Sequence, residues 1–305
     1  MSFYQTKDSM TRDLSKPKER AIIIPHHNDL ARLRRCLEAL WPQMQPDVDA
    51  VVVDNGSNPE IASEVLALTQ QFPGLRLEHE TQKGAAHARN RGVAATTARY
   101  LLFLDCDCVP DPDWLMRTRA SFDMADLVGG RVHVFDETPP PRSGAEAFET
   151  VFAFDNRDYV LRKGFSVTAN LVTRRDVFEA AGPFVNGLSE DVDWCRRATA
   201  AGFHLAFDDA LGVSHPTRSD WDALVRKWRR MTDEGFRVQG QGPLVRLRWA
   251  LRALAMPASV IFHFPRMLRH PDLRDWTERA RGGATLARLR GLRMVWMLRQ
   301  AILGR

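Results

Sequence analysis

The sequence has few of the features that mark secreted, disulfide-rich or membrane-spanning proteins. Four cysteines occur in 305 residues and none belongs to a Cys-x-x-Cys pair, so neither a disulfide framework nor a structural zinc site is indicated. The first 20 residues are polar and lack the apolar core of a secretory signal. The apolar stretch at residues 253–262 is shorter than the roughly 20 residues that a membrane span requires. We therefore expect a cytoplasmic protein with buried thiols.

Positive charge is scarce in the first two thirds of the chain and abundant in the last third. Residues 1–217 contain 24 lysines and arginines against 31 acidic residues, whereas residues 218–305 contain 19 against 7. A basic segment of this kind suits an anionic partner, either membrane headgroups or nucleic acid. We expect a flexible tail at residues 1–20, a main domain at residues 21–217 and a basic helical extension at residues 218–305.

The main domain begins with short apolar runs that alternate with segments of helical periodicity. The apolar runs lie at residues 21–25, 50–54, 75–80 and 99–105. This alternation with short connections predicts an α/β fold, in which a mostly parallel sheet is covered by helices on both faces. Ligands bind such sheets beyond the carboxyl ends of the strands. Asp54 and Asp105 both fall at predicted strand ends, so we expect them at one edge of the sheet.

The last of these runs continues as Asp-Cys-Asp-Cys, at residues 105–108. Alternate side chains of an extended chain share a face, so Asp105 and Asp107 are predicted to point one way, while Cys106 and Cys108 point into the core. Two carboxylates at the edge of a sheet make a site for Mg²⁺ or Mn²⁺, and such an ion neutralises a bound diphosphate. The alternative is that both aspartates only cap the turn that follows.

Five motifs occur in a fixed order along the main domain. They are VVVDNGS at 51–57, KGAAHARNRG at 83–92, YLLFLDCDCVPDPDWL at 100–115, TANLVTRRDVFEAAGPF at 168–184 and LSEDVDWCRRATAAGF at 188–203. Together they resemble the family 2 glycosyltransferases, which have the GT-A fold. The resemblance covers roughly residues 21–215. It implies a nucleotide-binding part at about 21–110, an acceptor part at about 111–217 and an inverting, metal-dependent sugar transfer.

The resemblance implies roles for particular residues of the donor site. The donor is expected to be a nucleotide-diphosphate sugar, with a uridine diphosphate sugar as the first expectation. The residues matched to donor binding are Pro25, Asn28, Asp54, Lys83, Gly84, Arg89 and Asp105. Asp54 would accept a hydrogen bond from the base, although a cap on the following turn explains it equally well. The family's metal shell matches Asp105, Asp107 and His215.

The resemblance also assigns the chemistry and the acceptor. Asp191, in SEDVDW, matches the catalytic base that deprotonates the acceptor hydroxyl. The residues matched to acceptor binding are Asn170, Glu190 and Asp193. Alternatively, Asp193 only forms an ion pair with an arginine one helical turn further along. Asn170 is equally well explained as a buried side chain whose amide forms hydrogen bonds within its own loop.

The basic extension has two open interpretations. Leu289, Leu292, Trp296 and Leu303 form one stripe of an imperfect amphipathic helix. The helices either contact the anionic inner face of a cell membrane, or they pack on the main domain or form a homo-oligomer. Membrane contact would suit a lipid-linked or cell-surface polysaccharide acceptor with a free hydroxyl.

Two rival functions follow from other features of the sequence. One is nucleotidyl transfer on a similar sheet. The other is a non-catalytic module that uses the basic extension to bind nucleic acid or membrane. Nucleic acid is the less favoured partner, because the acidic residues of the main domain would repel a polyanion.

Overall fold

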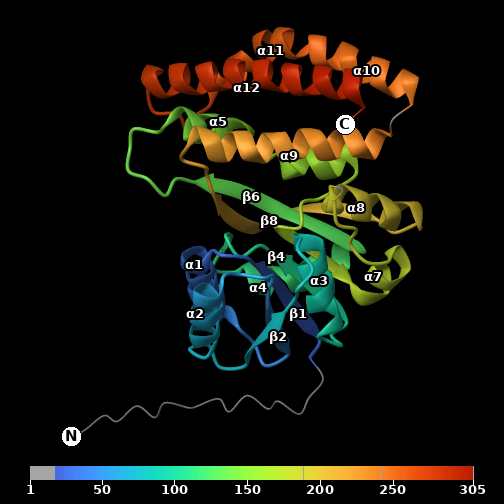
Figure 1. Ribbon diagram of the computed structural model, residues 1–305. Coiled ribbons are helices and arrows are strands. Elements are labelled where there is room, and N and C mark those ends of the chain that lie inside the picture. The colour runs from blue at the N-terminus through green and yellow to red at the C-terminus, as the bar shows by residue number, and fades with distance from the viewer. Residues whose placement is uncertain (1–17, 188, 241, 305) are drawn as a thin grey trace, which may run out of the picture.

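The computed structural model describes residues 18–187, 189–240 and 242–304, so most of the predicted N-terminal tail lies outside the described residues. The molecule has two layers, a lower α/β half around the sheet and an upper layer of long helices (Figure 1). Arg20, predicted to belong to the tail, is the first residue of strand β1 (Arg20–His26) and is buried. Its guanidinium binds the Asp47 carboxylate at 3.0 Å and the Leu115 carbonyl at 2.8 Å.

One sheet of eight strands runs through the lower half. Its strands are β1, β2 (Val48–Asp54), β3 (Leu75–His79), β4 (Tyr100–Leu104), β5 (Val109–Pro110), β6 (Leu127–Phe135), β7 (Asn170–Arg174) and β8 (Leu205–Pro216). They lie in the order β3-β2-β1-β4-β7-β6-β8-β5. The first four are parallel as predicted, with β3 at the edge, whereas β7 runs antiparallel to both β4 and β6. The sheet is therefore mixed, and the mostly parallel expectation holds for its first half.

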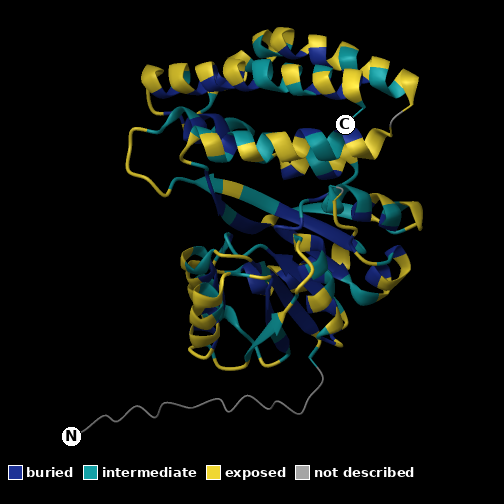
Figure 2. Cartoon of the chain, viewed as in Figure 1, coloured by how far each residue is buried: buried dark blue, intermediate teal, exposed yellow. Residues whose placement is uncertain are grey.

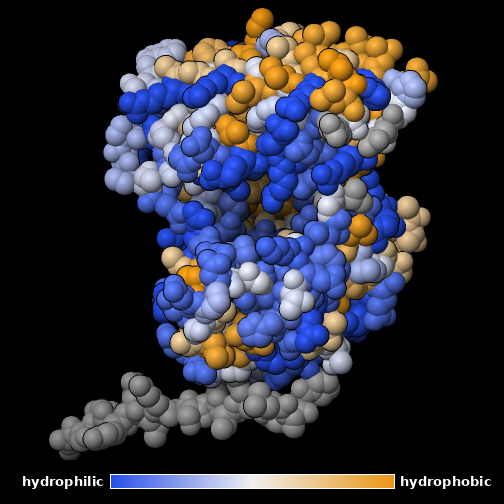
Figure 3. Space-filling view, in the orientation of Figure 1, coloured by the Kyte–Doolittle hydropathy of each residue, from blue (hydrophilic) through white to orange (hydrophobic). Residues whose placement is uncertain are grey.

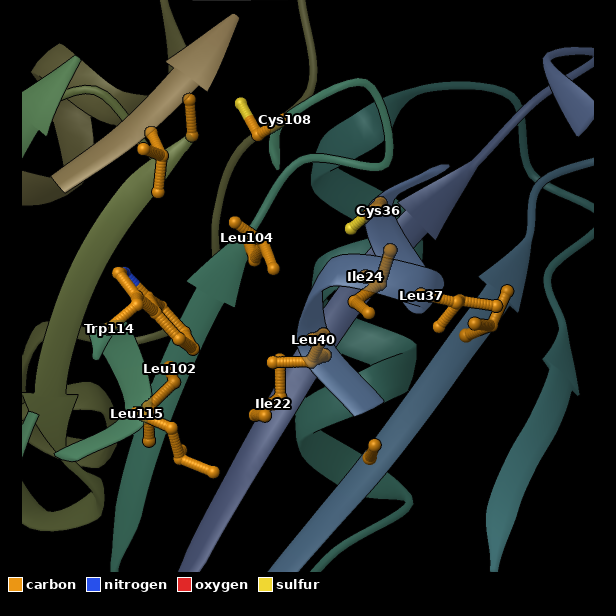
Figure 4. Close-up of a cluster of buried hydrophobic side chains, with 14 of the residues drawn as sticks. Ile22, Ile24, Cys36, Leu37, Leu40, Leu102, Leu104, Cys108, Trp114 and Leu115 are labelled. Carbon is orange, nitrogen blue, oxygen red and sulfur yellow. The ribbon is translucent and has the colours of Figure 1, made fainter. Parts of the chain in front are cut away.

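Helices cover both faces of the sheet. The shorter ones are α1 (Leu30–Leu40), α2 (Pro59–Thr69), α3 (Ala85–Ala94), α4 (Trp114–Met124), α5 (Gly144–Phe152), α6 (Asn156–Asp158), α7 (Arg175–Ala181) and α8 (Glu190–Ala200), with single turns η1 (Trp41–Gln43) and η2 (Tyr159–Lys163). Successive side chains of β1 point to opposite faces of the sheet, so this strand contributes to the hydrophobic core on each face. Ile22 and Ile24 pack with Leu37 and Trp114 on one face (Figure 4), and Ile23 packs in the cluster of α7 and α8 on the other.

The basic extension forms the upper layer and docks on the main domain. It consists of α9 (Trp221–Gln239), α10 (Pro243–Leu254), α11 (Met256–Arg269) and α12 (Trp276–Leu303). Leu286 and Leu289 of α12 pack against Phe148 of α5 in one buried cluster. At Gly282 a methyl group would meet the Met267 sulfur at 2.8 Å, so glycine lets α12 approach α11 closely. The predicted packing on the main domain is therefore present.

Arginine side chains stack on tryptophan rings between α9 and α12. The cation–ring distances run from 4.0 to 5.3 Å, for the pairs Arg288–Trp221, Arg293–Trp228 and Arg229–Trp296. Such contacts contribute on the order of 0.5–2 kcal/mol each, more when they are shielded from water. Part of the positive charge of the basic extension thus serves internal packing.

The outer side of the upper layer is apolar. Exposed aliphatic and aromatic residues gather on α10 and α11, namely Leu244, Leu247, Leu251, Leu254, Ile261 and Phe262. They belong to the exposed upper helices in Figure 2 and to the hydrophobic cap at the top of Figure 3. Leu303, predicted to share one apolar stripe with Leu289, is 51% exposed, whereas Leu289 is buried. Among the described helices, none combines the length and apolarity that crossing a membrane requires.

Candidate active site

A pocket of about 190 Å³ opens at the carboxyl ends of β1, β2 and β4. The parallel register sets His26 beside Asp54, and Asp105 follows directly after β4. The predicted meeting of these strand ends at one edge is confirmed. The lining comes from three loops and from α3, and consists of Pro25, His26, His27, Asn55, Ala85, Ala88, Arg89, Asp105, Cys106 and Asp107.

The Asp-Cys-Asp-Cys segment is a turn, so the predicted extended geometry is wrong. Strand β4 ends at Leu104, and the Cys108 amide donates to the Asp105 carbonyl at 3.0 Å. This turn brings Cys106 to the pocket together with both aspartates, while Cys108 is buried as expected. Burial and the two nearby carboxylates raise the pKa of both thiols well above the ordinary value. The cysteines are therefore protonated near neutral pH.

Asp107 and His215 converge although they come from different ends of the domain. The Asp107 Oδ2 atom lies 3.2 Å from His215 Nε2. The other ring nitrogen, Nδ1, lies 2.7 Å from the Pro216 carbonyl and must donate to it, because a carbonyl only accepts. Burial alone would raise the pKa of Asp107, but the positive charge of His215 outweighs it and lowers the pKa to about 2.

This arrangement fits a divalent cation. With Nδ1 committed as a donor, Nε2 is the ring atom that could bind a metal, and a cation would there replace the proton that His215 shares with the Asp107 carboxylate. Carboxylate oxygen and imidazole nitrogen are suitable ligands for Mn²⁺. Within the described residues no three histidine, cysteine or acidic side chains converge on one point. Of the three residues predicted as metal ligands, Asp107 and His215 are the two that the structure brings into contact.

Asp105 is held by a buried arginine instead. Arg89 of α3 is 4% exposed, and its guanidinium contacts Asp105 at 2.6 Å and Glu190 at 3.0 Å. Burial would lower the pKa of Arg89, but the two carboxylates raise it above its usual range. Arg89 therefore remains charged and ties the turn after β4 to the start of α8.

Asp191 occupies the first turn of α8, beside this arginine bridge. Its Oδ1 accepts a hydrogen bond from the Val192 amide at 2.8 Å. Burial raises the pKa of Asp191 and the Glu190 charge raises it further, while Arg89 opposes them, so the pKa rises to about 7. A carboxylate with such a pKa can accept a proton near neutral pH, as general-base catalysis requires.

Asp54 stabilises the turn after β2, and Asn55 faces the pocket in its place. The Asp54 carboxylate accepts hydrogen bonds from the hydroxyl and amide of Ser57 and from His26 Nδ1. His26 Nε2 in turn accepts from the Asp29 amide, which fixes the proton on Nδ1. The observed contacts of Asp54 therefore support the alternative, in which this residue caps the turn after β2.

Asn55 and Asn186 hold the loop before α3, and sequence reasoning assigned a role to neither. Asn55 accepts from the Gly84 amide at 2.8 Å, and Asn186 donates to the Lys83 carbonyl at 3.0 Å. Gly84 has φ +132°, which favours glycine, and a side chain there would collide with Asn186. Lys83 is exposed beside this loop. The feature of the sequence that could have indicated a role for Asn55 was the Asn-Gly pair directly after β2.

Comparison with known proteins identifies the family. The model of "Glycosyl transferase family 2" matches residues 21–182. The chain belongs to family 2 of the glycosyltransferases. Glycosyltransferase AglE of Haloferax volcanii is 33% identical over 217 residues, which cover 68% of this chain and 70% of that protein. The pre-mycofactocin glycosyltransferase of Mycobacterium tuberculosis is 30% identical over 230 residues, and this chain spans about half of its length, 47%.

Solved structures confirm the GT-A-like fold of this glycosyltransferase. The mannosyltransferase PcManGT from Pyrobaculum calidifontis, in complex with GDP-Man and Mn²⁺, superimposes with a TM-score of 0.61 at 15% identity, covering 95% of this chain and 89% of that one. S. aureus TarS 1-349, in complex with UDP-GlcNAc, gives 0.53 at 13% identity and covers 94% and 92%. At these identities the likeness concerns the fold.

Other residues matched to the glycosyltransferase family lie elsewhere. Asn170 is wholly buried, where it accepts from the Trp114 indole and donates to the Arg131 and Leu211 carbonyls, so its predicted acceptor contact is replaced by a structural one. Asp193 pairs with Arg197 at 2.8 Å, the predicted alternative. Asn28 is exposed, with φ 52°, and accepts from the Asn58 amide rather than lining the pocket.

Arg218, which the motifs did not indicate, lies near the His215 end of the candidate site. It follows His215 by three positions, and its charge contributes to the low pKa of Asp107. Its guanidinium lies 3.1 Å from Glu149, a buried carboxylate that also pairs with Lys227 of α9 at 2.7 Å. The start of the basic extension is therefore tied electrostatically to the His215 end of the site.

Proposed function

We propose that this family 2 glycosyltransferase moves a sugar from a nucleotide-diphosphate donor to an acceptor hydroxyl with inversion at the anomeric carbon. The observation that carries the proposal is the position and pKa of Asp191. This carboxylate takes up a proton near pH 7 and is linked through Glu190 and Arg89 to Asp105 at the donor pocket. This link supports a base that acts next to a bound diphosphate.

The chemistry is a single displacement. Asp191 removes the proton of the acceptor hydroxyl as the oxygen attacks the anomeric carbon. The bond between that carbon and the diphosphate oxygen breaks, and the electron pair leaves with the nucleoside diphosphate. Attack from the side opposite the leaving group inverts the configuration. The proton on Asp191 is then released to solvent, which the pKa of about 7 permits.

Donor binding is proposed for residues around the 190 Å³ pocket. Pro25 and Asn55 line it, Arg89 and Asp105 form its charged wall, and Lys83 and Gly84 lie in the loop that leads into α3. The amide groups at the start of α3 favour phosphate. A UDP-sugar is the first donor to test, with a GDP-sugar second, because proteins of the same fold hold UDP-GlcNAc or GDP-Man.

Asp107 and His215 are proposed to hold Mg²⁺ or Mn²⁺. When bound, the cation would neutralise charge on the diphosphate. The support is the 3.2 Å approach of Oδ2 to Nε2, with Nδ1 fixed as a donor by Pro216. The Mn²⁺ in the mannosyltransferase of similar fold agrees with this choice.

The acceptor is proposed to be lipid-linked, because α10 and α11 present a surface suited to an anionic membrane. Leu244, Leu247, Leu251 and Leu254 recur every three or four residues and form one exposed stripe on α10. Residues 243–269 include five arginines and no acidic residue. Basic and apolar groups on one helical layer favour burial at the headgroup boundary of anionic lipid. We infer peripheral attachment at the inner face of a cell membrane.

Transfer assays with and without Mn²⁺ test the chemistry. Wild-type protein is expected to release nucleoside diphosphate from a nucleotide sugar only when metal is present. The Asp191→Asn variant should lose at least about 10²-fold in rate, since general-base catalysis contributes about that much, and should bind the donor normally. Full activity in this variant would refute the base assignment. Release of sugar 1-phosphate, which leaves when the α-phosphorus of the nucleotide sugar is attacked, would instead indicate nucleotidyl transfer.

Sedimentation with phosphatidylglycerol vesicles tests the membrane surface. Leu251→Ser and Phe262→Ser should each reduce binding, because each removes an exposed apolar side chain from the bilayer contact. Leu66→Ser is the matched control, since Leu66 is 50% exposed on the remote helix α2. Dimers that dissociate in the two upper-layer variants, without vesicle binding by the wild type, would identify a second copy as the occupant.

A further inference from the structure

A second and larger cavity, of about 480 Å³, lies between the C-terminal end of α5, the η2 turn and the C-terminal end of α11. Its apolar wall includes Phe154 and Tyr159. Its cations are Lys163 from η2 and the pair Arg266 and Arg269 from α11. The cavity thus joins the main domain to the basic extension.

This cavity adjoins the candidate active site. The Phe154 ring lies 4.9 Å from the His215 ring, centroid to centroid. Burial raises the pKa of Tyr159, and the carboxylate of Asp191 is among the charges that raise it further. The two walls therefore contact the proposed metal ligand and lie within electrostatic range of the proposed base. The cavity and the candidate active site are therefore neighbours that share the contact between Phe154 and His215.

The charges of the cavity favour an anion. Arg266 and Arg269 are exposed and form no hydrogen bond or ion pair with any residue in the described part of the chain. Asp158 pairs with Lys163 at 2.8 Å and with Arg162 at 3.1 Å, and Arg266 adds a longer-range attraction without forming an ion pair with it. Asp155 accepts from the Asp158 amide as the cap of α6. Two unpaired guanidinium groups therefore remain for a ligand, and guanidinium groups suit phosphate.

The same side of α11 connects the cavity to the apolar outer surface. Phe262, Arg266 and Arg269 recur at spacings of four and three residues, so they lie on one side of the helix. Phe262 is 79% exposed. A ligand with its phosphate at the arginines can extend an apolar chain past Phe262 toward the apolar surface of α10 and α11.

We propose that this cavity is the acceptor site and that Arg266 and Arg269 bind a phosphate group of the acceptor. The inference rests on the proposed function and deepens it, because it gives the acceptor a chemical class: a phosphate ester that also carries the hydroxyl to be glycosylated. The phosphate belongs either to a membrane lipid or to a soluble phosphorylated acceptor.

Binding to the full chain tests this proposal without turnover. The probes are farnesyl phosphate, farnesol and inorganic phosphate, followed by tryptophan fluorescence. Wild-type protein is expected to bind farnesyl phosphate about tenfold more tightly than farnesol, as charge-assisted hydrogen bonds permit. The double variant Arg266→Gln/Arg269→Gln should lose that tenfold preference, with unchanged farnesol binding showing that it is folded. Arg299→Gln, an exposed arginine of α12, is the matched control and should retain it.

The outcomes separate the two proposals. Equal affinity of wild type and double variant for farnesyl phosphate overturns the acceptor site, even if donor turnover proceeds. Arginine-dependent binding by a protein that turns over no nucleotide sugar keeps the site and removes the proposed function. Displacement of the probe by inorganic phosphate supports a soluble phosphorylated acceptor. Failure of inorganic phosphate to compete, with arginine dependence intact, supports a lipid phosphate.

Discussion

Oδ2 of Asp107 lies 3.2 Å from Nε2 of His215, and Asp107 also lines the pocket at the carboxyl ends of the strands. Asp107 comes from the turn after β4, whereas His215 lies near the end of β8. The other ring nitrogen, Nδ1, donates a hydrogen bond to the Pro216 carbonyl. Strand β8, which is remote from β4 in the sequence, therefore places an imidazole beside the Asp107 carboxylate.

The first prediction concerns metal binding at this pair. His215→Ala should weaken Mn²⁺-dependent binding of a nucleoside diphosphate about 10–100-fold, since one of two protein ligands is lost. Isothermal titration with Mn²⁺ held at several concentrations measures the loss. Asp113→Asn removes an exposed acid paired with Arg117 and should change nothing. An Mn²⁺ affinity of His215→Ala equal to that of the wild type would place the metal elsewhere.

The second prediction concerns the pH dependence of transfer. Activity requires ionised Asp191, so kcat/KM should rise with pH through an apparent pKa of about 7. The Glu190 charge helps to raise that pKa. Glu190→Gln should therefore move the rise to lower pH, by on the order of one pH unit. Asp193→Asn, whose carboxylate pairs with Arg197, should leave the midpoint of the profile in place. A shift of Glu190→Gln to higher pH would contradict the electrostatic model.

The third prediction concerns stability. The pKa of Asp191 is about 7 in the folded protein against 3.8 for the ordinary group. Between these values the folded state holds a proton that the unfolded chain has released, so this group's contribution to stability falls as pH rises from about 4 to 7. Asparagine never ionises. Asp191→Asn should raise the free energy of unfolding at pH 8 by on the order of 2 kcal/mol and change little at pH 4. Urea titrations at both pH values measure the difference, and destabilisation at pH 8 would show that the pKa is not raised.

The sequence was sufficient for the arrangement of the donor half. Strand and helix periodicity placed β1 to β4 in order, and parallel pairing then required Asp54 and Asp105 to meet at one edge. Family motifs added Asp191 and His215. Asp54 and Asp105 could be placed because each lies at the end of a strand whose apolar pattern is strong, whereas Asp191 and His215 depended on the family resemblance.

Long-range contacts could not be read in the same way. Asn170 was predicted to bind the acceptor. Its side-chain amide instead forms hydrogen bonds with Trp114, Arg131 and Leu211, which belong to three other segments of the chain. The turn at Asp105 depends on one backbone hydrogen bond from Cys108, which leaves no trace in the apolar pattern. The cavity at Arg266 exists because α11 folds back over α5. Each outcome depends on tertiary packing that overrides local patterns.

The fourth prediction concerns the ion pair between Glu149 and Lys227, which joins the extension to the main domain. Glu149 is 1% exposed, and Lys227 binds it at 2.7 Å with its ammonium 5.3 Å from the Phe154 ring. Burial lowers the pKa of Lys227, while the Glu149 charge opposes that effect. Lys227→Met would leave a buried carboxylate with Arg218 as its remaining cation.

Removing one partner of a buried pair costs about 3–5 kcal/mol, and the remaining Arg218 should reduce this to about 2–3 kcal/mol for Lys227→Met. Arg226→Met changes the neighbouring cation of α9, which is exposed, and should alter the free energy of unfolding by less than about 0.5 kcal/mol. Chemical denaturation of both variants measures the contrast. Since Phe154 contacts both Lys227 and His215, loss of the lysine should also weaken farnesyl phosphate binding. Equal stability of the two variants would show that this ion pair does not hold the layers together.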